Sequence, residues 1–354
     1  MTYTSRMKRD PVPRPGIYEL YWQFASRRQQ AYERRIAGQP WPWTDDTILQ
    51  TYKFCNVFRA ADRVSQYMIR DVCYHDDPCS DDDRMFQIVA FRTFSKIDTW
   101  RSLHALLGRA PTLADLDSGG FEQALNEAKE QNGGLYTGAF ILCATNSYGR
   151  SLKHLNHVEL FRHMFLKDKL GDKIKSAGSL REVYDLLHGY PLMGDFMSYQ
   201  TTIDLNYSAL VNFSENEFTQ AGPGALRGIK KCFSDLAGNT PAEVILWMVN
   251  RQHDEMERLG LPFNGLWGRP LHAIDCQSLF CETDKYCREA APEIASARKR
   301  IKARFAATPE SMKLFFPPKW RINSKLPKRA VLGSDEEQPA KKPKPRKKAQ
   351  QELF

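Results

Sequence analysis

The segment Thr240-Pro-Ala-Glu-Val-Ile-Leu-Trp-Met-Val249 shows the pattern of an α-helix, which is the type of secondary structure that we predict for most of this chain. Thr240 and Glu243 have the spacing of a capping box, in which each side chain accepts a hydrogen bond from the other's backbone amide, and Pro241 suits a first helical turn. Ser179 and Glu182 repeat this spacing. Both pairs predict the N-terminus of an α-helix.

Apolar residues recur at spacings of three and four through most of the sequence, from about Pro15 to Pro317. No sustained alternation with a period of two is visible, so helices are favoured over strands. Turns that contain Gly and Pro separate the periodic segments. We therefore predict an all-α domain of ten or more helices over residues 15–317, which could divide into two lobes.

The composition narrows the class of protein. The 354 residues are 42% hydrophobic and 12% aromatic, which is enough to build a core. No apolar run reaches the roughly 18 residues of a membrane span, and residues 1–14 are too polar for a secretory signal. We expect no membrane association and a cytoplasmic location: the host cytoplasm for a phage-encoded protein, or the nucleus in a eukaryote.

The charge is concentrated near the C-terminus. The chain carries +9 overall, and the part from Lys325 onward holds nine Lys or Arg against four Asp or Glu. We predict a flexible N-terminus over residues 1–14 and a disordered basic tail over residues 318–354. A basic chain of this kind points to nucleic acid as the polyanionic partner.

The eight cysteines lie mostly in apolar or helical segments and are expected to be free thiols. The spacing of Cys276, Cys281 and Cys287 fits neither a paired zinc motif nor a common iron–sulfur motif. We predict no metal site and no cofactor.

Polar residues between Phe54 and Arg70 follow a helical spacing. Asn56, Arg59, Arg63, Gln66 and Arg70 are three or four residues apart, which predicts one stripe along a helix with Asp62 beside it. The stripe has no carboxylate, and forked arginines with amides suit phosphates or base edges. A solvated helix face is the alternative.

Three further segments could carry chemistry. Gln200, Asp204 and Tyr207 share one face of a predicted helix, where they could hold a base edge or form a core network. Gly222-Pro-Gly224 could open a helix whose amides grip a phosphate, although an ordinary turn is equally compatible. Asp275, Glu282 and Lys285 share another face and could shift one another's pKa values, or form an exposed ion-pair ladder.

Taken in order along about residues 51–288, these segments resemble the family of α-glutamyl/putrescinyl thymine pyrophosphorylases, or amino acid:DNA transferases. The resemblance extends to the helical domain of phage 5-hydroxymethyluridine DNA kinases, and the glycine hairpin resembles that of helix-hairpin-helix DNA glycosylases. It rests on Phe54–Arg59 with Asp62-Arg63, Phe91–Phe94, Gly194–Phe196 with Tyr199-Gln200, Asp204–Tyr207, Gly222–Gly224, and Asp275 with Cys281-Glu282 and Lys285-Tyr286.

The resemblance implies a DNA-modifying transferase with a multi-helix fold like that of the glycosylases. An amine, such as an amino acid or putrescine, would displace pyrophosphate from 5-pyrophosphoryloxymethyl-uracil in double-stranded DNA, after the base is flipped out of the duplex. The implied catalytic residues are Asp275 or Glu282, as the base that takes a proton from the amine, and Lys285, which would contact the phosphates. The implied substrate-binding residues are Asn56, Arg59, Arg63, Gln200, Asp204, Asn206, Tyr207 and Tyr286. The implied DNA-binding residues are Gly222, Gly224, Arg227, Lys230 and Lys231.

Other functions stay open on the sequence alone. A helix-hairpin-helix glycosylase would release the base, although Leu226 stands where lyase-type members carry a catalytic lysine. A complete kinase would need a motif such as GxxxxGK[ST], which the chain lacks. A non-catalytic DNA-binding module would bind in a salt-sensitive way and leave the nucleosides unchanged.

The last five residues suggest a second partner. Gln350-Gln-Glu-Leu353-Phe354 resembles the pentapeptide that binds the bacterial sliding clamp, in which the Gln and the final Leu-Phe pair fill an apolar pocket. A frayed terminus is the alternative. The preceding run of Lys and Arg could tether the chain to DNA or serve as a nuclear signal.

Overall fold

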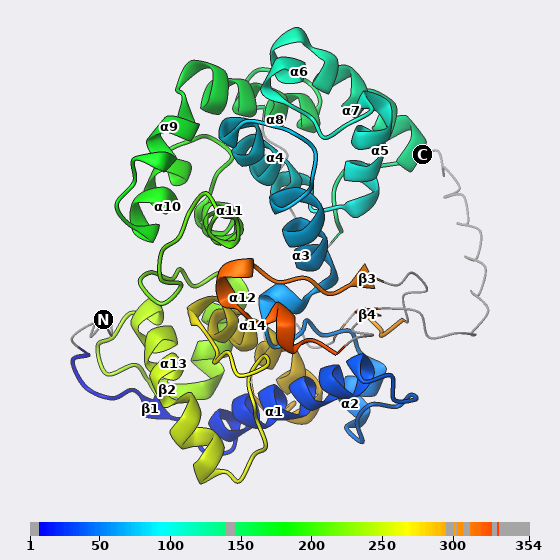
Figure 1. The fold of residues 1–354 in the computed structure, drawn as a ribbon. Helices are drawn as coiled ribbons and strands as arrows, with labels where there is room; N and C mark the ends of the chain where they lie inside the picture. The colour runs from blue at the N-terminus through cyan, green and yellow to red at the C-terminus, as the bar shows by residue number, and fades with distance from the viewer. Residues whose placement is uncertain are drawn as a thin grey trace, which may run out of the picture.

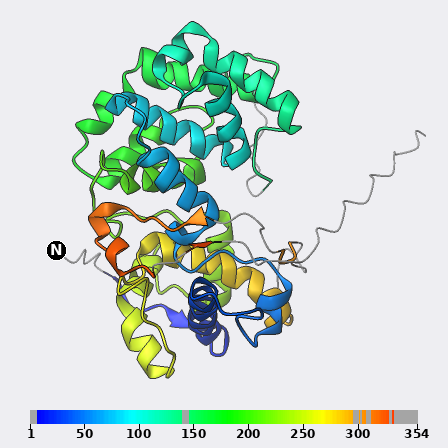
Figure 2. The same cartoon turned by 45° about the vertical axis from the view of Figure 1, so that its right-hand side comes forward.

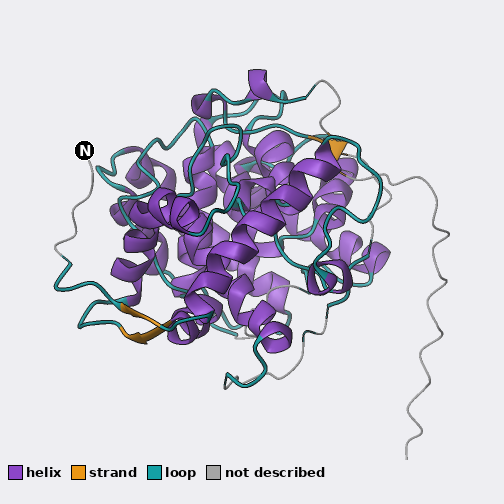
Figure 3. Cartoon of the chain, turned by 90° about the horizontal axis from the view of Figure 1, so that it is seen from below, coloured by secondary structure: helices purple, strands orange, loops and turns teal. Residues whose placement is uncertain are grey.

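The computed structural model describes residues 7–138, 146–294, 301, 303–306, 312–327 and 331–332. In these ranges the chain forms fourteen α-helices and two short antiparallel strand pairs, which confirms the all-α prediction (Figures 1 and 3). None of the helices in these ranges is long and apolar enough to span a membrane.

The helices and strands have the following bounds. The α-helices are α1 Ile17–Ile36, α2 Thr47–Thr51, α3 Arg63–Tyr67, α4 Asp81–Phe94, α5 Ile97–Leu107, α6 Leu113–Ser118, α7 Gly120–Asn132, α8 Lys153–Phe161, α9 Leu170–Lys175, α10 Leu180–His188, α11 Asp195–Tyr207, α12 Pro223–Cys232, α13 Pro241–Arg258 and α14 Ala273–Ala290. The remaining elements are β1 Val12–Pro13, β2 Phe233–Asp235, β3 Met312–Lys313, β4 Val331–Leu332, the 3₁₀ turns η1 Arg59–Ala61, η4 Pro318–Trp320 and η5 Asn323–Lys325, and the π-helices η2 Met68–Cys73 and η3 Arg162–Lys167.

The predicted helix starts are confirmed. Thr240 and Glu243 form the reciprocal capping box of α13, with Pro241 in its first turn. Ser179 caps α10 by accepting a hydrogen bond from the amide of Glu182 at 3.1 Å, whereas the Glu182 carboxylate reaches one residue further back, to Gly178. Local capping chemistry is thus sufficient to place these two starts.

The helices form two groups with a strap between them. Helices α4 to α11 lie in the upper part of Figure 1, and α1, α2 and α12 to α14 lie in the lower part; Figure 2 shows the same division after rotation. Residues 312–327, which we call the strap, cross between the groups. A continuous set of buried apolar side chains connects the helices of both groups.

The ends of the helical domain differ from the prediction. Residues 318–327, assigned from composition to a disordered tail, pack on the body: Lys319 donates hydrogen bonds to the carbonyls of Asn206, Ser208 and Val211 near the end of α11. At the other end, β1 pairs with β2, so residues 12 and 13 are not flexible as predicted. Composition gave the wrong limits because long-range contacts order these polar segments. The basic run over residues 339–348 and the Gln350–Phe354 pentapeptide lie outside the described residues.

The predicted helical stripe over residues 54–70 is also wrong. The chain is irregular at residues 53–58, turns through η1, and becomes helical from Arg63. Asn56 and Gln66 are buried, and each donates its amide to a nearby backbone carbonyl. The helical spacing gave a wrong prediction for residues 54–62, because long-range hydrogen bonds fix the backbone of this segment.

Candidate functional site

Residues 54–62 form a loop whose backbone is held by three carboxylates. The amide of Cys55 donates to Glu282 at 3.1 Å, and the amide of Asn56 donates to Asp62 at 2.8 Å. The amide of Arg59 donates to Asp275 at 2.9 Å. Two of the three acceptors are acids that the sequence had assigned to catalysis.

The two α14 acids fit the loop because of their spacing. Asp275 and Glu282 are seven residues apart, which is two helical turns, so they lie on one face as predicted. The second oxygen of Asp275 accepts a hydrogen bond from His272 at the start of α14. Asp275 is 3% exposed, and its burial, together with the nearby Glu215, raises its pKa to about 7. Both oxygens of this carboxylate are therefore engaged in holding the backbone.

The side chain of Arg59 connects the loop to α11. Its Nε donates to Gln200 at 2.7 Å, its Nη1 donates to Asp204 at 2.8 Å, and its guanidinium lies 5.5 Å from the centre of the Tyr207 ring. Arg92 of α4 also pairs with Asp204. The predicted shared face of α11 is confirmed, but it faces a buried arginine.

The burial of these α11 side chains leaves little space beside them for a DNA base. Asp204 and Tyr207 are fully buried, and Gln200 is 6% exposed. Asn206 both donates to and accepts from the backbone of Phe213. In this structure these predicted base-binding residues form a core network, which was the alternative interpretation of the pattern.

A group of polar side chains, some of them accessible to solvent, lies where the loop meets α1 and α14. We call it the recess and define it by Arg28, Cys55, Asp62, Glu282 and Lys285. Cys55 is exposed, whereas Arg28 and Asp62 are half-buried. Desolvation nevertheless raises the pKa of the Cys55 thiol. The charged groups that lie near this thiol include Glu282, Asp62 and Lys285.

Lys285 is a partly exposed cation of the recess. Its Nζ lies 2.5 Å from a Glu282 oxygen, and its side chain is 28% exposed. Burial favours the neutral amine, but the charge of Glu282 outweighs it and raises the pKa of Lys285 above its ordinary value. Lys285 is therefore cationic at neutral pH and suits an anion better than it suits nucleophilic attack.

Arg28 orients the loop from α1. Its Nε donates to the Cys55 carbonyl at 3.1 Å, and its Nη2 donates to the side chain of Asn56. No local sequence signal marked Arg28, because its partners lie 27 and 28 residues away. Of two other predicted substrate residues, Tyr286 donates to Asp46 at 2.6 Å, and Arg63 is half-buried on α3.

The glycines of the predicted hairpin lie against neighbouring helices. A Cβ on Gly224 would fall 2.3 Å from Sγ of Cys281, and a Cβ on Gly228 would fall 2.0 Å from the Phe280 carbonyl. Gly222 precedes α12, where a Cβ would lie 3.1 Å from Phe196. The close packing of α12 on α14 accounts for Gly224 without a phosphate.

The basic residues of α12 differ in accessibility. Arg227 and Lys231 each lie 3.1 Å from Asp284, and Arg288 lies 2.7 Å from the same carboxylate. Lys231 is 4% exposed, whereas Lys230 is exposed. Of the predicted DNA contacts on α12, Lys230 and the partly exposed Arg227 are the ones that can reach a large ligand.

Sequence reasoning also missed a polar cluster beneath the strap. Glu215 pairs with Arg269 at 2.6 Å, and the Arg269 guanidinium lies 3.6 Å from the centre of the Trp320 ring. These residues come from three distant segments, so no spacing could connect them. They hold the strap beside the loop that follows α11.

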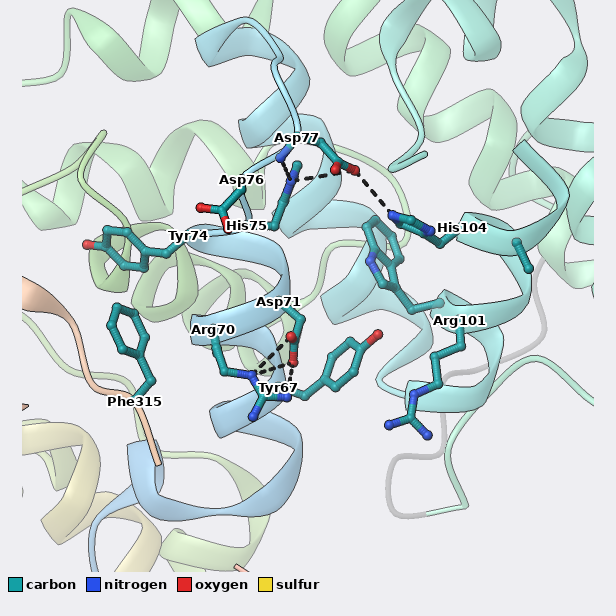
Figure 4. Close-up of a pocket in the computed structure, with 12 residues that line it drawn as sticks. Tyr67, Arg70, Asp71, Tyr74, His75, Asp76, Asp77, Arg101, His104 and Phe315 are labelled. Carbon is teal, nitrogen blue, oxygen red and sulfur yellow. Dashed lines mark hydrogen bonds and ion pairs between the residues drawn. The ribbon is translucent and has the colours of Figure 1, made fainter. Parts of the chain in front are cut away.

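A separate cavity of about 680 Å³ lies between η2 and α5, with Phe315 of the strap in its lining (Figure 4). Arg70 pairs with Asp71 at 2.7 Å, and Asp77 pairs with His104 at 3.2 Å. The lining carboxylates are Asp71, Asp76 and Asp77, and the guanidinium groups are Arg70 and Arg101. Because carboxylates outnumber guanidinium groups, a polyanion is disfavoured here. Among the described residues, no group of three or more His, Cys, Asp or Glu side chains could hold a metal ion.

Comparison with known proteins identifies the relatives of this helical domain. Residues 15–296 match the family model described as "5-hmdU DNA kinase, helical domain". The chain belongs to this family. The 5-hmdU DNA kinase of Bacillus phage SP10 is 26% identical over 309 residues, which cover 81% of this chain and 47% of the relative. No solved structure matches the chain.

Membership of the 5-hmdU DNA kinase helical-domain family confirms one part of the predicted resemblance and connects the chain with DNA modification. The chain spans about half the length of the curated relative, and the match lies in the helical domain. The loop over residues 54–62, α11 and α14 all lie within the matched range, so the recess is part of the family's domain.

Proposed function

We propose that this chain is a transferase that acts on thymine derivatives in DNA. An amino acid or a polyamine displaces pyrophosphate from 5-pyrophosphoryloxymethyl-uracil: a bond forms between the amine nitrogen and the methylene carbon, and the bond from that carbon to the pyrophosphate oxygen breaks. The electron pair of the broken bond leaves with pyrophosphate. The reaction needs an extruded base, a cation for the leaving group and an acceptor for a proton.

One observation carries the proposal: a partly exposed lysine that is cationic at neutral pH lies beside carboxylates in the recess. Lys285 is held cationic by Glu282 and is 28% exposed, so it can stabilise the charge that develops on the departing pyrophosphate. The carboxylate-rich cavity beside α5 is a poorer place for that polyanion. We therefore assign the phosphates to the recess.

The sequence further separates this reaction from phosphorylation. Residues 15–296 match the model of the kinase family's helical domain, and the chain contains no GxxxxGK[ST] motif. We propose that the helical domain works on the modified base itself, rather than on a nucleoside triphosphate.

Nucleoside mass spectrometry tests the function. DNA that carries 5-pyrophosphoryloxymethyl-uracil is incubated with the full chain and a mixture of glycine, glutamate and putrescine. The DNA is then digested, and the masses of the nucleosides are measured. We expect a new aminated nucleoside and release of pyrophosphate. Free base with an abasic site would indicate a glycosylase instead, and unchanged nucleosides despite DNA binding would indicate a non-catalytic module.

A pair of variants links the activity to the recess. Lys285→Met removes the cation, so we expect transfer to fall about 100-fold, as for the loss of one electrostatic stabiliser of a transition state. Lys173→Met is the matched control, because Lys173 is an accessible lysine on α9, outside the recess. Equal activity of the two variants would remove Lys285 from the reaction.

A further inference from the structure

Asp62 is an aspartate at a helix N-terminus that does not cap its helix. It directly precedes α3, yet its side chain accepts no hydrogen bond from the α3 amides. Instead, one oxygen turns back and accepts the amide of Asn56 at 2.8 Å. An N-cap aspartate normally satisfies the amides of its own first turn, so this orientation needs another explanation.

The other carboxylates around the recess have their oxygens engaged. Glu282 accepts the amide of Cys55 and pairs with Lys285. Asp275 accepts the amides of Arg59 and His272. Within the part of the chain that the structure describes, Asp62 makes a hydrogen bond through one oxygen only, and it is half-buried rather than closed off.

We propose that Asp62 accepts the proton that the attacking amine loses in the transfer reaction. The inference rests on the proposed function, and it moves this role away from Asp275 and Glu282. Asp62 has a free carboxylate oxygen, and Lys285 belongs to the same recess. The proton acceptor and the cation for the leaving group are therefore in one place.

The proton balance of the step is simple. At neutral pH the incoming amine is an ammonium ion without a free electron pair. Asp62 takes one proton and becomes a carboxylic acid, and the freed pair forms the bond to the methylene carbon while pyrophosphate leaves. The product is a secondary ammonium ion, and the proton on Asp62 then passes to water.

The charged surroundings of Asp62 suit this role. Burial raises its pKa to about 6, against the opposing effects of the Asn56 amide and Arg28. The groups that face it are Arg28 and Tyr32 from α1, Glu282 from α14, and Cys55 and Arg59 from the loop. Asp62 is thus ionised at neutral pH and is a stronger base than an ordinary aspartate.

The test compares two amines in the Asp62→Asn variant. Asparagine retains an oxygen that can accept the Asn56 amide, so the loop contact survives. Putrescine arrives protonated, whereas hydroxylamine is largely unprotonated at neutral pH and needs no base. We expect Asp62→Asn to slow putrescine transfer at least about 100-fold, which is the usual size of a general-base contribution, and to slow hydroxylamine transfer only a few-fold.

A pH profile gives a second readout. Putrescine transfer by the wild type should fall as pH drops through about 6, where Asp62 becomes protonated, and Asp62→Asn should lack this acidic limb. Asp71→Asn is the control, since Asp71 is partly exposed and pairs with Arg70 beside the other cavity. Equal loss of both amines, or an acidic limb that survives in Asp62→Asn, would overturn the role of Asp62. A wild-type protein that transfers neither of these amines, and neither glycine nor glutamate, would instead refute the proposed function.

Discussion

The carboxylate of Asp275 and the backbone amide of Arg59 are 2.9 Å apart, although 216 residues separate them in the sequence. This bond fixes the turn from which the Arg59 side chain reaches Asp204 on α11. A single carboxylate at the start of α14 thereby helps to position a link between the two groups of helices. The residue that sequence reasoning assigned to proton transfer has a structural role in the described fold.

Asp275 should make the stability of the protein depend on pH. Its pKa is raised from 3.8 to about 7, so the folded state binds this proton more tightly than the unfolded state does. The resulting stabilisation is complete below pH 4 and is lost as pH rises through about 7; the shift corresponds to roughly 4 kcal/mol. Urea unfolding at several pH values measures it. Asp275→Asn should show a flatter profile between pH 4 and 7, and a slope equal to that of the wild type would contradict the prediction.

Arg59 should be essential for stability. Arg59→Met leaves Gln200 without its partner and Asp204 with only Arg92, inside a fully buried network. Breaking a buried ion pair typically costs about 3–5 kcal/mol, so we expect a comparable loss in the free energy of unfolding. Arg109→Met is the control, because its pair with Asp115 is exposed and should contribute less than about 1 kcal/mol. Similar losses in the two variants would argue against the network.

Gly228 should tolerate no side chain. A Cβ would lie 2.0 Å from the Phe280 carbonyl, so Gly228→Ala must push α12 away from α14. We expect a destabilisation of about 2 kcal/mol or more, as for an overpacked core. Gly134→Ala adds the same methyl group where nothing lies within 4 Å and should change stability by less than about 0.5 kcal/mol. Thermal unfolding separates the two, and equal midpoints would disprove the close contact.

Trp320 should hold the strap in place. Its ring lies 3.6 Å from the Arg269 guanidinium and 5.4 Å from the Tyr207 ring, so Trp320→Ala removes the strap's contacts with both. We expect faster cleavage within residues 312–327 during limited proteolysis, because local opening becomes easier. Trp41→Ala, at a site that is 44% exposed, is the control. Unchanged cleavage of the strap would show that other contacts are sufficient.

Much of the helical architecture follows from local sequence, because capping and amphipathic spacing involve residues only a few positions apart. Thr240 with Glu243, and the shared faces of α11 and α14, are examples that the structure confirms. The stripe from Asn56 to Arg70 is the opposite case. Its spacing is helical, but carboxylates more than 200 residues away hold part of its backbone in an irregular loop.

The residues that surround the loop were likewise easier to select from the sequence than their contacts were to predict. Arg59, Gln200, Asp204, Asp275, Glu282 and Lys285 were all selected from the sequence, and hydrogen bonds and ion pairs connect them to the loop or to each other. Which of their oxygens are free, and which are used to hold the backbone, depends on partners that no spacing reveals. Arg28 and Trp320 carried no local signal for the same reason.

The sequence alone determined that this chain is helical, where several of its helices begin, and which polar side chains share a face, since those properties depend on neighbours within one or two helical turns. Only the tertiary structure decided which of those side chains are buried in ion pairs and which meet solvent. Burial and pairing depend on atoms brought together from distant segments, and these set the charge state and the availability of each group.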